Sequence, residues 1–147
     1  GKRNDDNSSL GDWYVNEEKL GGTLTKLIER VNAEGVKFGI WIEPEMINPK
    51  SELFEKHPDW AITLPNRETY YYRNQLVLDL SNPKVQDFVF GVVDNILTAN
   101  PEVAFFKWDC TPSVLSVCPI FSFLRNGMMI GPNTTLIAKE ISTGITT

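Results

Sequence analysis

A lysine and an aspartate two residues apart end one apolar segment of the chain, in Lys107-Trp108-Asp109. If that segment is a strand, alternation places both side chains on the same face. The ammonium group would keep the carboxylate ionised near neutral pH, and an ionised aspartate can act as a nucleophile. The alternative is an ion pair that caps a strand, although charges at the end of a buried strand are costly to desolvate.

A second group of candidate residues follows another β-rich segment. Trp41 lies beside Glu43 and Glu45, a pattern that suits a sugar, because an aromatic face packs on the C–H face of a pyranose while carboxylates bind its hydroxyls. The alternative is a core tryptophan with two solvated glutamates. Arg73 offers forked donors for hydroxyls or a carboxylate, with an ion pair to Glu43 or Asp79 as the alternative.

Other kinds of site have little support. The only histidine, His57, lies in a Pro-bounded loop without a nucleophile motif, which favours a structural role. Cys110 and Cys118 fit neither a disulfide framework nor a metal site, so we expect free thiols and no metal. No glycine-rich phosphate loop follows any expected strand, which disfavours nucleotide binding.

The composition of the chain argues against two classes of binding partner. The chain has 147 residues, 14 basic and 19 acidic, a net charge of −5 and 41% apolar residues, which suits a soluble globular unit. The mild acidity argues against nucleic acid as a partner. No apolar run reaches the roughly 18 residues of a membrane span, and the first residues do not resemble a signal peptide. We therefore expect neither a nucleic acid nor a membrane as partner.

Helical and strand patterns alternate along the chain. We expect, in order, a helix over 24–31 capped by Thr23, a strand over 36–42, a short helix over 51–56, a strand over 76–80, a helix from Pro83 to Asn100, and a strand over 103–109. This order predicts an α/β fold with a parallel sheet, which includes the near-continuous apolar strand over 76–80. An open doubly wound sheet and a barrel both fit, and a barrel collects functional residues at its strand ends. Only three charged residues follow Cys110, so the density of charged residues falls sharply there.

Five motifs then carry a family resemblance. They are Leu10-Gly11-Asp12-Trp13, Phe38-Gly39-Ile40-Trp41-Ile42-Glu43-Pro44-Glu45-Met46, His57-Pro58-Asp59-Trp60, Arg73-Asn74-Gln75-Leu76-Val77-Leu78-Asp79-Leu80 and Lys107-Trp108-Asp109. In this order they resemble the α-galactosidases of glycoside hydrolase clan D, family 36. The resemblance implies that residues 1–110 form a partial catalytic (β/α)8 TIM barrel of about three β/α units. Residues 111–147 do not share it and are expected to be a divergent tail.

The resemblance also implies roles. Asp109 would be the nucleophile of a retaining enzyme that removes terminal α-linked galactose, as in melibiose and raffinose, by double displacement. Lys107, Trp41 and Arg73 would bind the substrate. The family's Cys-Ser-Gly-Gly-Gly region, which leads to its acid/base aspartate, is not found after Asp109, so the sequence assigns no acid/base residue.

The remaining expectations rest on the same likeness. They are small-molecule galactosides as ligands, no cofactor, a cytoplasmic location and a full-length parent that forms homo-oligomers. One alternative is a non-catalytic, truncated or frameshifted remnant with at most weak galactose binding, and the isolated chain is expected to be inactive. Another is a related barrel, such as an α-N-acetylgalactosaminidase or a galactosyl transferase.

Overall fold

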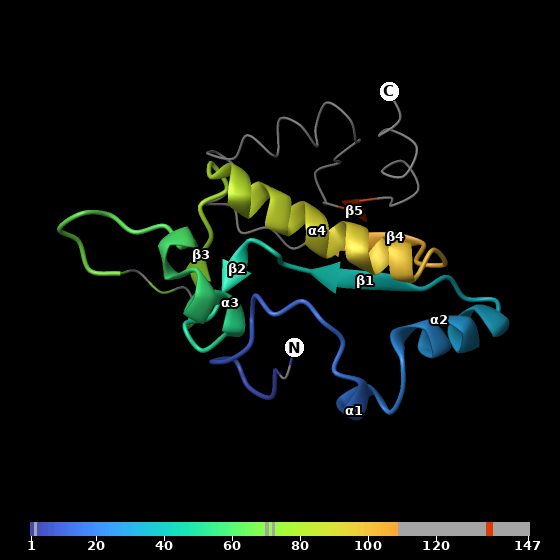
Figure 1. The fold of residues 1–147 in the computed structure, drawn as a ribbon. Helices are drawn as coiled ribbons and strands as arrows, with labels where there is room; N and C mark the ends of the chain where they lie inside the picture. Colours follow the sequence, from blue (N-terminus) through green and yellow to red (C-terminus); the bar gives the residue numbers. More distant parts are fainter. Residues whose placement is uncertain (2, 70, 72, 109–134, 137–147) are drawn as a thin grey trace, which may run out of the picture. The chain divides into compact units, whose positions relative to one another are not determined.

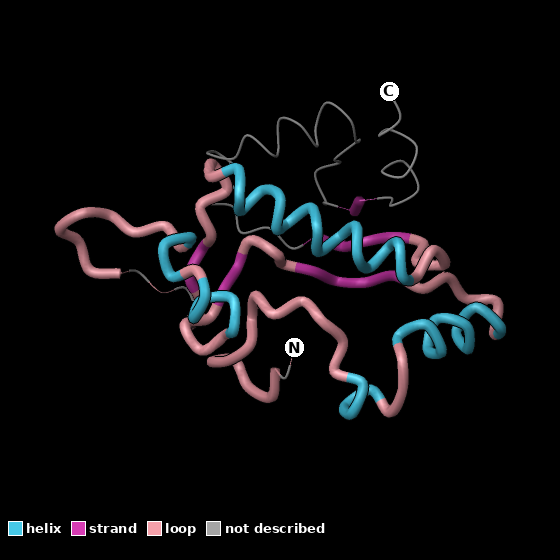
Figure 2. Tube along the Cα trace, viewed as in Figure 1, coloured by secondary structure: helices cyan, strands magenta, loops and turns pink. Residues whose placement is uncertain are grey.

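A computed structural model describes residues 1, 3–69, 71, 73–108 and 135–136 (Figure 1). The elements are α1 (Glu17–Leu20), α2 (Leu24–Ala33), β1 (Gly39–Ile42), β2 (Met46–Ile47), α3 (Glu52–Lys56), a 3-10 helix (Pro58–Trp60), β3 (Leu76–Val77), α4 (Pro83–Ala99), β4 (Phe105–Trp108) and β5 (Thr135–Leu136). The described residues between the 3-10 helix and β3, which are 61–69, 71 and 73–75, belong to no helix or named strand (Figure 2). None of the helices in the described part of the chain is long and apolar enough to cross a membrane.

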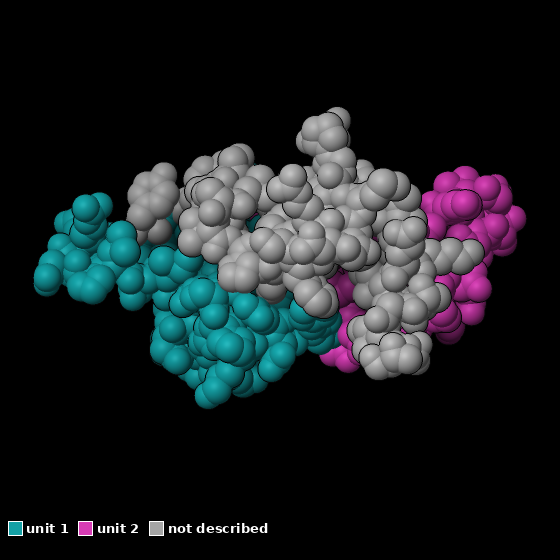
Figure 3. Space-filling view, turned by 90° about the horizontal axis from the view of Figure 1, so that it is seen from above, with its two compact units in different colours: residues 1–16, 44–92 teal, residues 17–43, 93–147 magenta. Residues whose placement is uncertain are grey.

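The chain divides into two compact units, each built from separate stretches of sequence (Figure 3). Unit 1 comprises residues 1–16 and 44–92, and unit 2 comprises residues 17–43 and 93–147, so α4 contributes residues to both. Unit 2 contains a three-stranded sheet in the order β1-β4-β5. β1 and β4, the first and third predicted strands, pair in parallel, as the predicted parallel sheet requires, and β5 is antiparallel to β4.

Unit 1 corrects the prediction for residues 76–80. Only Leu76–Val77 form a strand, and it pairs antiparallel with β2 rather than joining a parallel sheet. Beyond it, the Leu78 amide donates to the carbonyl of Glu45, in the turn before β2. The Asp79 amide donates to the carbonyl of Trp60, the last residue of the 3-10 helix. Leu76, Leu78 and Leu80 are buried in this setting. The apolar run therefore indicated burial correctly but not the direction of the partner strand.

The helices follow their local sequence signals. The Thr23 side chain accepts a hydrogen bond from the Lys26 amide at the start of α2, and Ser51 does the same for the Phe54 amide of α3. Helix α4 begins at Pro83, as expected, and the preceding Asn82 side chain accepts a bond of 3.0 Å from the Lys84 amide. Its buried side chains are those of Val85, Val89, Val92 and Val93.

Candidate active site

Trp41 and Lys107 are direct neighbours on parallel strands. In the β1–β4 register Trp41 is the partner of Lys107, so their side chains lie on the same face of the sheet. That face is open within the described chain: Lys107 is exposed and Trp41 is 46% exposed. The following pair, Ile42 and Trp108, is buried on the opposite face. The structure thus brings together two of the four predicted site residues.

The preceding pair on this face is Gly39 and Phe105. A Cβ atom built on Gly39 would lie 2.2 Å from Cζ of Phe105, so the aromatic ring occupies the space above the glycine. Phe105 is itself 37% exposed. We call Gly39, Trp41, Phe105 and Lys107 the strand face. It presents two aromatic side chains and one ammonium group, which suits a ligand with both C–H surfaces and hydroxyl groups.

Asp109, the predicted nucleophile, lies outside the described residues, as do Cys110 and Cys118. Strand β4 ends at Trp108. The role of Asp109 therefore stays a prediction from the sequence.

Arg73 belongs to unit 1, where it is exposed in a turn just before β3. Arg73 and Asn74 both have positive φ angles, 50° and 62°. The left-handed region is unfavourable for arginine and is better tolerated by asparagine. The Asn74 carbonyl accepts a hydrogen bond of 3.0 Å from Nδ2 of Asn48.

The glutamates that follow Trp41 differ from the expected sugar-facing pair. Glu43 is half-buried, while Glu45 is fully buried, in unit 1. Glu45 therefore presents no carboxylate at the surface of this unit. Its carbonyl instead accepts the Leu78 amide, which makes the backbone at this position structural.

His57 has the structural surroundings that the sequence suggested. Its ring stacks on Trp60 at a centroid distance of 4.0 Å and an interplanar angle of 11°. Trp60 in turn contacts Phe88 of α4, with centroids 5.9 Å apart. Within the described residues there is no group of three or more His, Cys, Asp or Glu side chains that could hold a metal ion.

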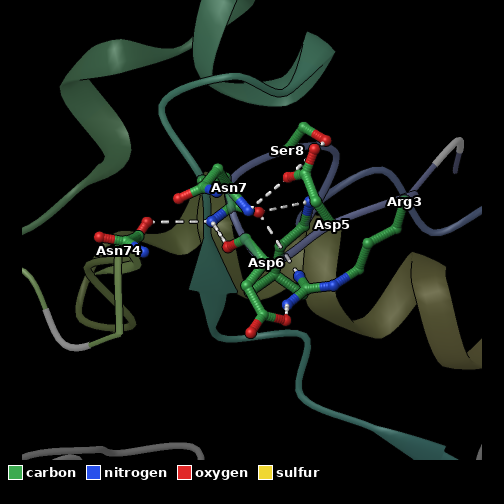
Figure 4. A network of polar contacts seen from close by, with 8 residues as sticks. Arg3, Asp5, Asp6, Asn7, Ser8 and Asn74 are labelled. Atoms are coloured by element: carbon green, nitrogen blue, oxygen red, sulfur yellow. Dashed lines mark hydrogen bonds and ion pairs between the residues drawn. The ribbon is translucent and has the colours of Figure 1, made fainter.

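Sequence reasoning missed Asn48, which is fully buried and directly follows β2. Its side chain connects the N-terminal segment with the turn that carries Arg73 (Figure 4). The only sequence signal was a polar residue between the apolar pair Met46-Ile47 and a proline. That pattern does not distinguish a buried junction from an ordinary loop.

Comparison with known proteins assigns the chain to a family. The family model described as Melibiase matches residues 1–120. The bifunctional α-galactosidase/sucrose kinase AgaSK of Mediterraneibacter gnavus is 54% identical over 117 residues, which cover 80% of this chain and 12% of that protein. The α-galactosidase AgaA of Geobacillus stearothermophilus is 49% identical over 109 residues, covering 74% of this chain and 15% of AgaA. The chain thus spans less than a sixth of either relative.

A solved structure gives the same assignment. The crystal structure of the GH36 α-galactosidase AgaB from Geobacillus stearothermophilus matches with a TM-score of 0.69 and 50% identity, over 74% of this chain and 15% of AgaB. This likeness agrees with the α/β fold. Because the family model covers more than three quarters of the sequence, the chain belongs to the Melibiase family.

Proposed function

We propose that this chain forms part of the catalytic (β/α)8 barrel of a retaining α-galactosidase. The observation that supports this most directly is the pairing of Trp41 with Lys107 on the open strand face, in a chain of the Melibiase family. Barrel enzymes bind their substrates at the carboxyl ends of the parallel strands, and this ring and this cation lie on two such strands.

Each side chain then has a chemical task. The Trp41 ring packs on the C–H face of galactose, and the Lys107 ammonium donates to its hydroxyls. Asp109 attacks the anomeric carbon as the bond to the leaving oxygen breaks, with a proton delivered to that oxygen by a second carboxyl group about 5–5.5 Å away. Water then hydrolyses the galactosyl ester on Asp109. We assign the second carboxyl group to no residue of this chain.

The proposed substrates are oligosaccharides with a terminal α-linked galactose, such as melibiose and raffinose. Variants of AgaA have been crystallised with raffinose and with stachyose, and they are 49% and 48% identical to this chain over 74% of its length. For the full-length protein we also propose homo-oligomer formation and a cytoplasmic location, following the same family resemblance.

Galactose binding can be tested by tryptophan fluorescence of the 147-residue chain. Of the four tryptophans, Trp41 is 46% exposed, Trp60 and Trp108 are only 8% and 5% exposed, and the half-buried Trp13 belongs to unit 1 and not to the strand face. A sugar on the strand face should therefore change mainly the Trp41 emission. We expect a saturable response to millimolar galactose, none to glucose, and loss of the response in Trp41→Phe. A response to galactose that persists in Trp41→Phe, or no response in the unaltered chain, would contradict the proposed site.

A further inference from the structure

The polar network around Asn48 lies in unit 1 and includes the turn that carries Arg73. We infer that Asn48 is a positioning residue, which holds the Arg73–Asn74 turn in its left-handed conformation and thereby directs the Arg73 side chain toward a galactoside. The functional half of this inference rests on the proposed function. The structural half, that Asn48 holds the turn, stands on contacts within unit 1 alone.

The side chain of Asn48 extends the β2–β3 ladder beyond its last backbone pair. Met46 pairs with Val77 and Ile47 with Leu76, so Asn48 comes next, opposite the residues that precede β3. Its backbone amide does not continue the ladder but donates to the Leu10 carbonyl at 2.9 Å. The side-chain Nδ2 instead donates to the Asn74 carbonyl at 3.0 Å, which ties the turn to the end of β2.

All the hydrogen-bonding capacity of the Asn48 amide is used. Besides Asn74, Nδ2 donates to the Asp6 carbonyl at 3.3 Å, while Oδ1 accepts from the Leu10 amide at 3.0 Å and from Arg3 Nη1 at 3.4 Å. An amide group offers two donors and two acceptor lone pairs, so these four contacts fix its orientation. Figure 4 shows the network between the N-terminal segment and Asn74. Asn48 is also 0% exposed, so water does not compete for these groups.

The Arg73–Asn74 turn needs a stabilising contact such as the hydrogen bond from Asn48. Two consecutive residues other than glycine with positive φ persist only where surrounding contacts over-determine them, and such strained backbone is concentrated at functional sites. Here the strained residues are the predicted substrate-binding Arg73 and the residue after it. Without the bond to its carbonyl, Asn74 can relax to a common backbone conformation, which rotates the Arg73 side chain away from its present direction.

The test compares two buried asparagines in the 147-residue chain. Asn48→Asp keeps the shape and the acceptors but removes the donors to Asn74 and Asp6. Asn100→Asp is the matched control, because Asn100 is 6% exposed and its Nδ2 likewise donates to a backbone carbonyl, that of Ile96 at 3.0 Å. Asn48→Ser is a second variant without a charge, and its side chain is too short to reach Asn74. If the buried charge of Asn48→Asp prevents folding, Asn48→Ser tests whether Asn48 holds the turn.

The first readout is the turn itself, followed by nitrogen and proton NMR. The Gln75 amide shares a peptide group with the Asn74 carbonyl, so its nitrogen shift reports the bond from Asn48. We expect the Gln75 and Asn74 amides to shift and to exchange faster in the Asn48 variants but not in Asn100→Asp. Unchanged Asn74 and Gln75 signals in a folded Asn48 variant would overturn the inference.

The second readout is the response of the Arg73 Nε–Hε signal to 1-deoxygalactonojirimycin, the ligand of one AgaA complex. In the unaltered chain we expect the signal to shift on titration, and in the Asn48 variants the midpoint should rise on the order of tenfold, as expected for loss of one well-placed hydrogen bond. An unchanged midpoint overturns the inference. Failure of the unaltered chain to respond contradicts the role of Arg73 in the proposed function, and the turn measurement then decides the structural half separately.

Discussion

At the scale of single residues, the strand face depends on Gly39, because this glycine has no side chain to occupy the space of the Phe105 ring. Phe105 lies over Gly39, and both precede the Trp41–Lys107 pair in the same register. The φ angle of Gly39 is not in the left-handed region, so the glycine is required for space and not for backbone conformation. Its role is to let an aromatic ring lie flat against the sheet next to Trp41.

Replacement of Gly39 by alanine should therefore destabilise the protein. The new Cβ atom would lie 2.2 Å from Cζ of Phe105, so this ring, which is 37% exposed, must move off the sheet, at the low end of the about 1–3 kcal/mol that overpacking costs in cores. The matched control is Gly91→Ala in α4, where nothing lies within 4 Å of the added atom and the change should stabilise by about 0.5–1 kcal/mol. Urea unfolding measures both free energies, and equal effects of the two substitutions would refute this account of Gly39.

At the scale of elements, local signals predicted the helices well. The signals that begin and end the helices act through contacts within a few residues. They are Thr23 and Gly35 around α2, Ser51 before α3 and Pro83 at the start of α4. The pairing of residues 76–80 depends instead on β2, about 30 residues earlier in the chain. Alternation and apolarity carry no information about the direction of a distant partner, so this prediction was wrong.

The cap of α2 provides a test at this scale. Oγ1 of Thr23 accepts a bond of 3.3 Å from the Lys26 amide, and loss of such a cap costs about 1 kcal/mol. We expect Thr23→Ala to lower the free energy of unfolding by that amount and to speed hydrogen exchange of the Lys26 amide. Thr23→Ser should keep most of the stability and most of the protection of the Lys26 amide. If Thr23→Ala and Thr23→Ser behave alike, the cap is not what begins the helix.

At the scale of the whole molecule, the site is assembled from residues far apart in the sequence. The spacing of Lys107 and Asp109 suggested a shared face, but only the β1–β4 register reveals that Trp41 is the neighbour of Lys107. Burial of Glu45 and the junction at Asn48 could not be predicted, because both depend on segments that come together only in the folded unit. Residue chemistry suggested Asp109 and Arg73 as candidates, and the family motifs supplied their specific roles.

A chimeric enzyme can show whether this chain supplies the nucleophile of a working α-galactosidase. Residues 1–120, the span of the family match, would replace the corresponding segment of the AgaSK galactosidase domain, which is 56% identical to this chain in the structural match. We expect the chimera to hydrolyse raffinose with release of α-galactose, and we expect Asp109→Asn to abolish turnover while the protein stays folded. A folded chimera without activity, or one that remains active after Asp109→Asn, would contradict the proposed function.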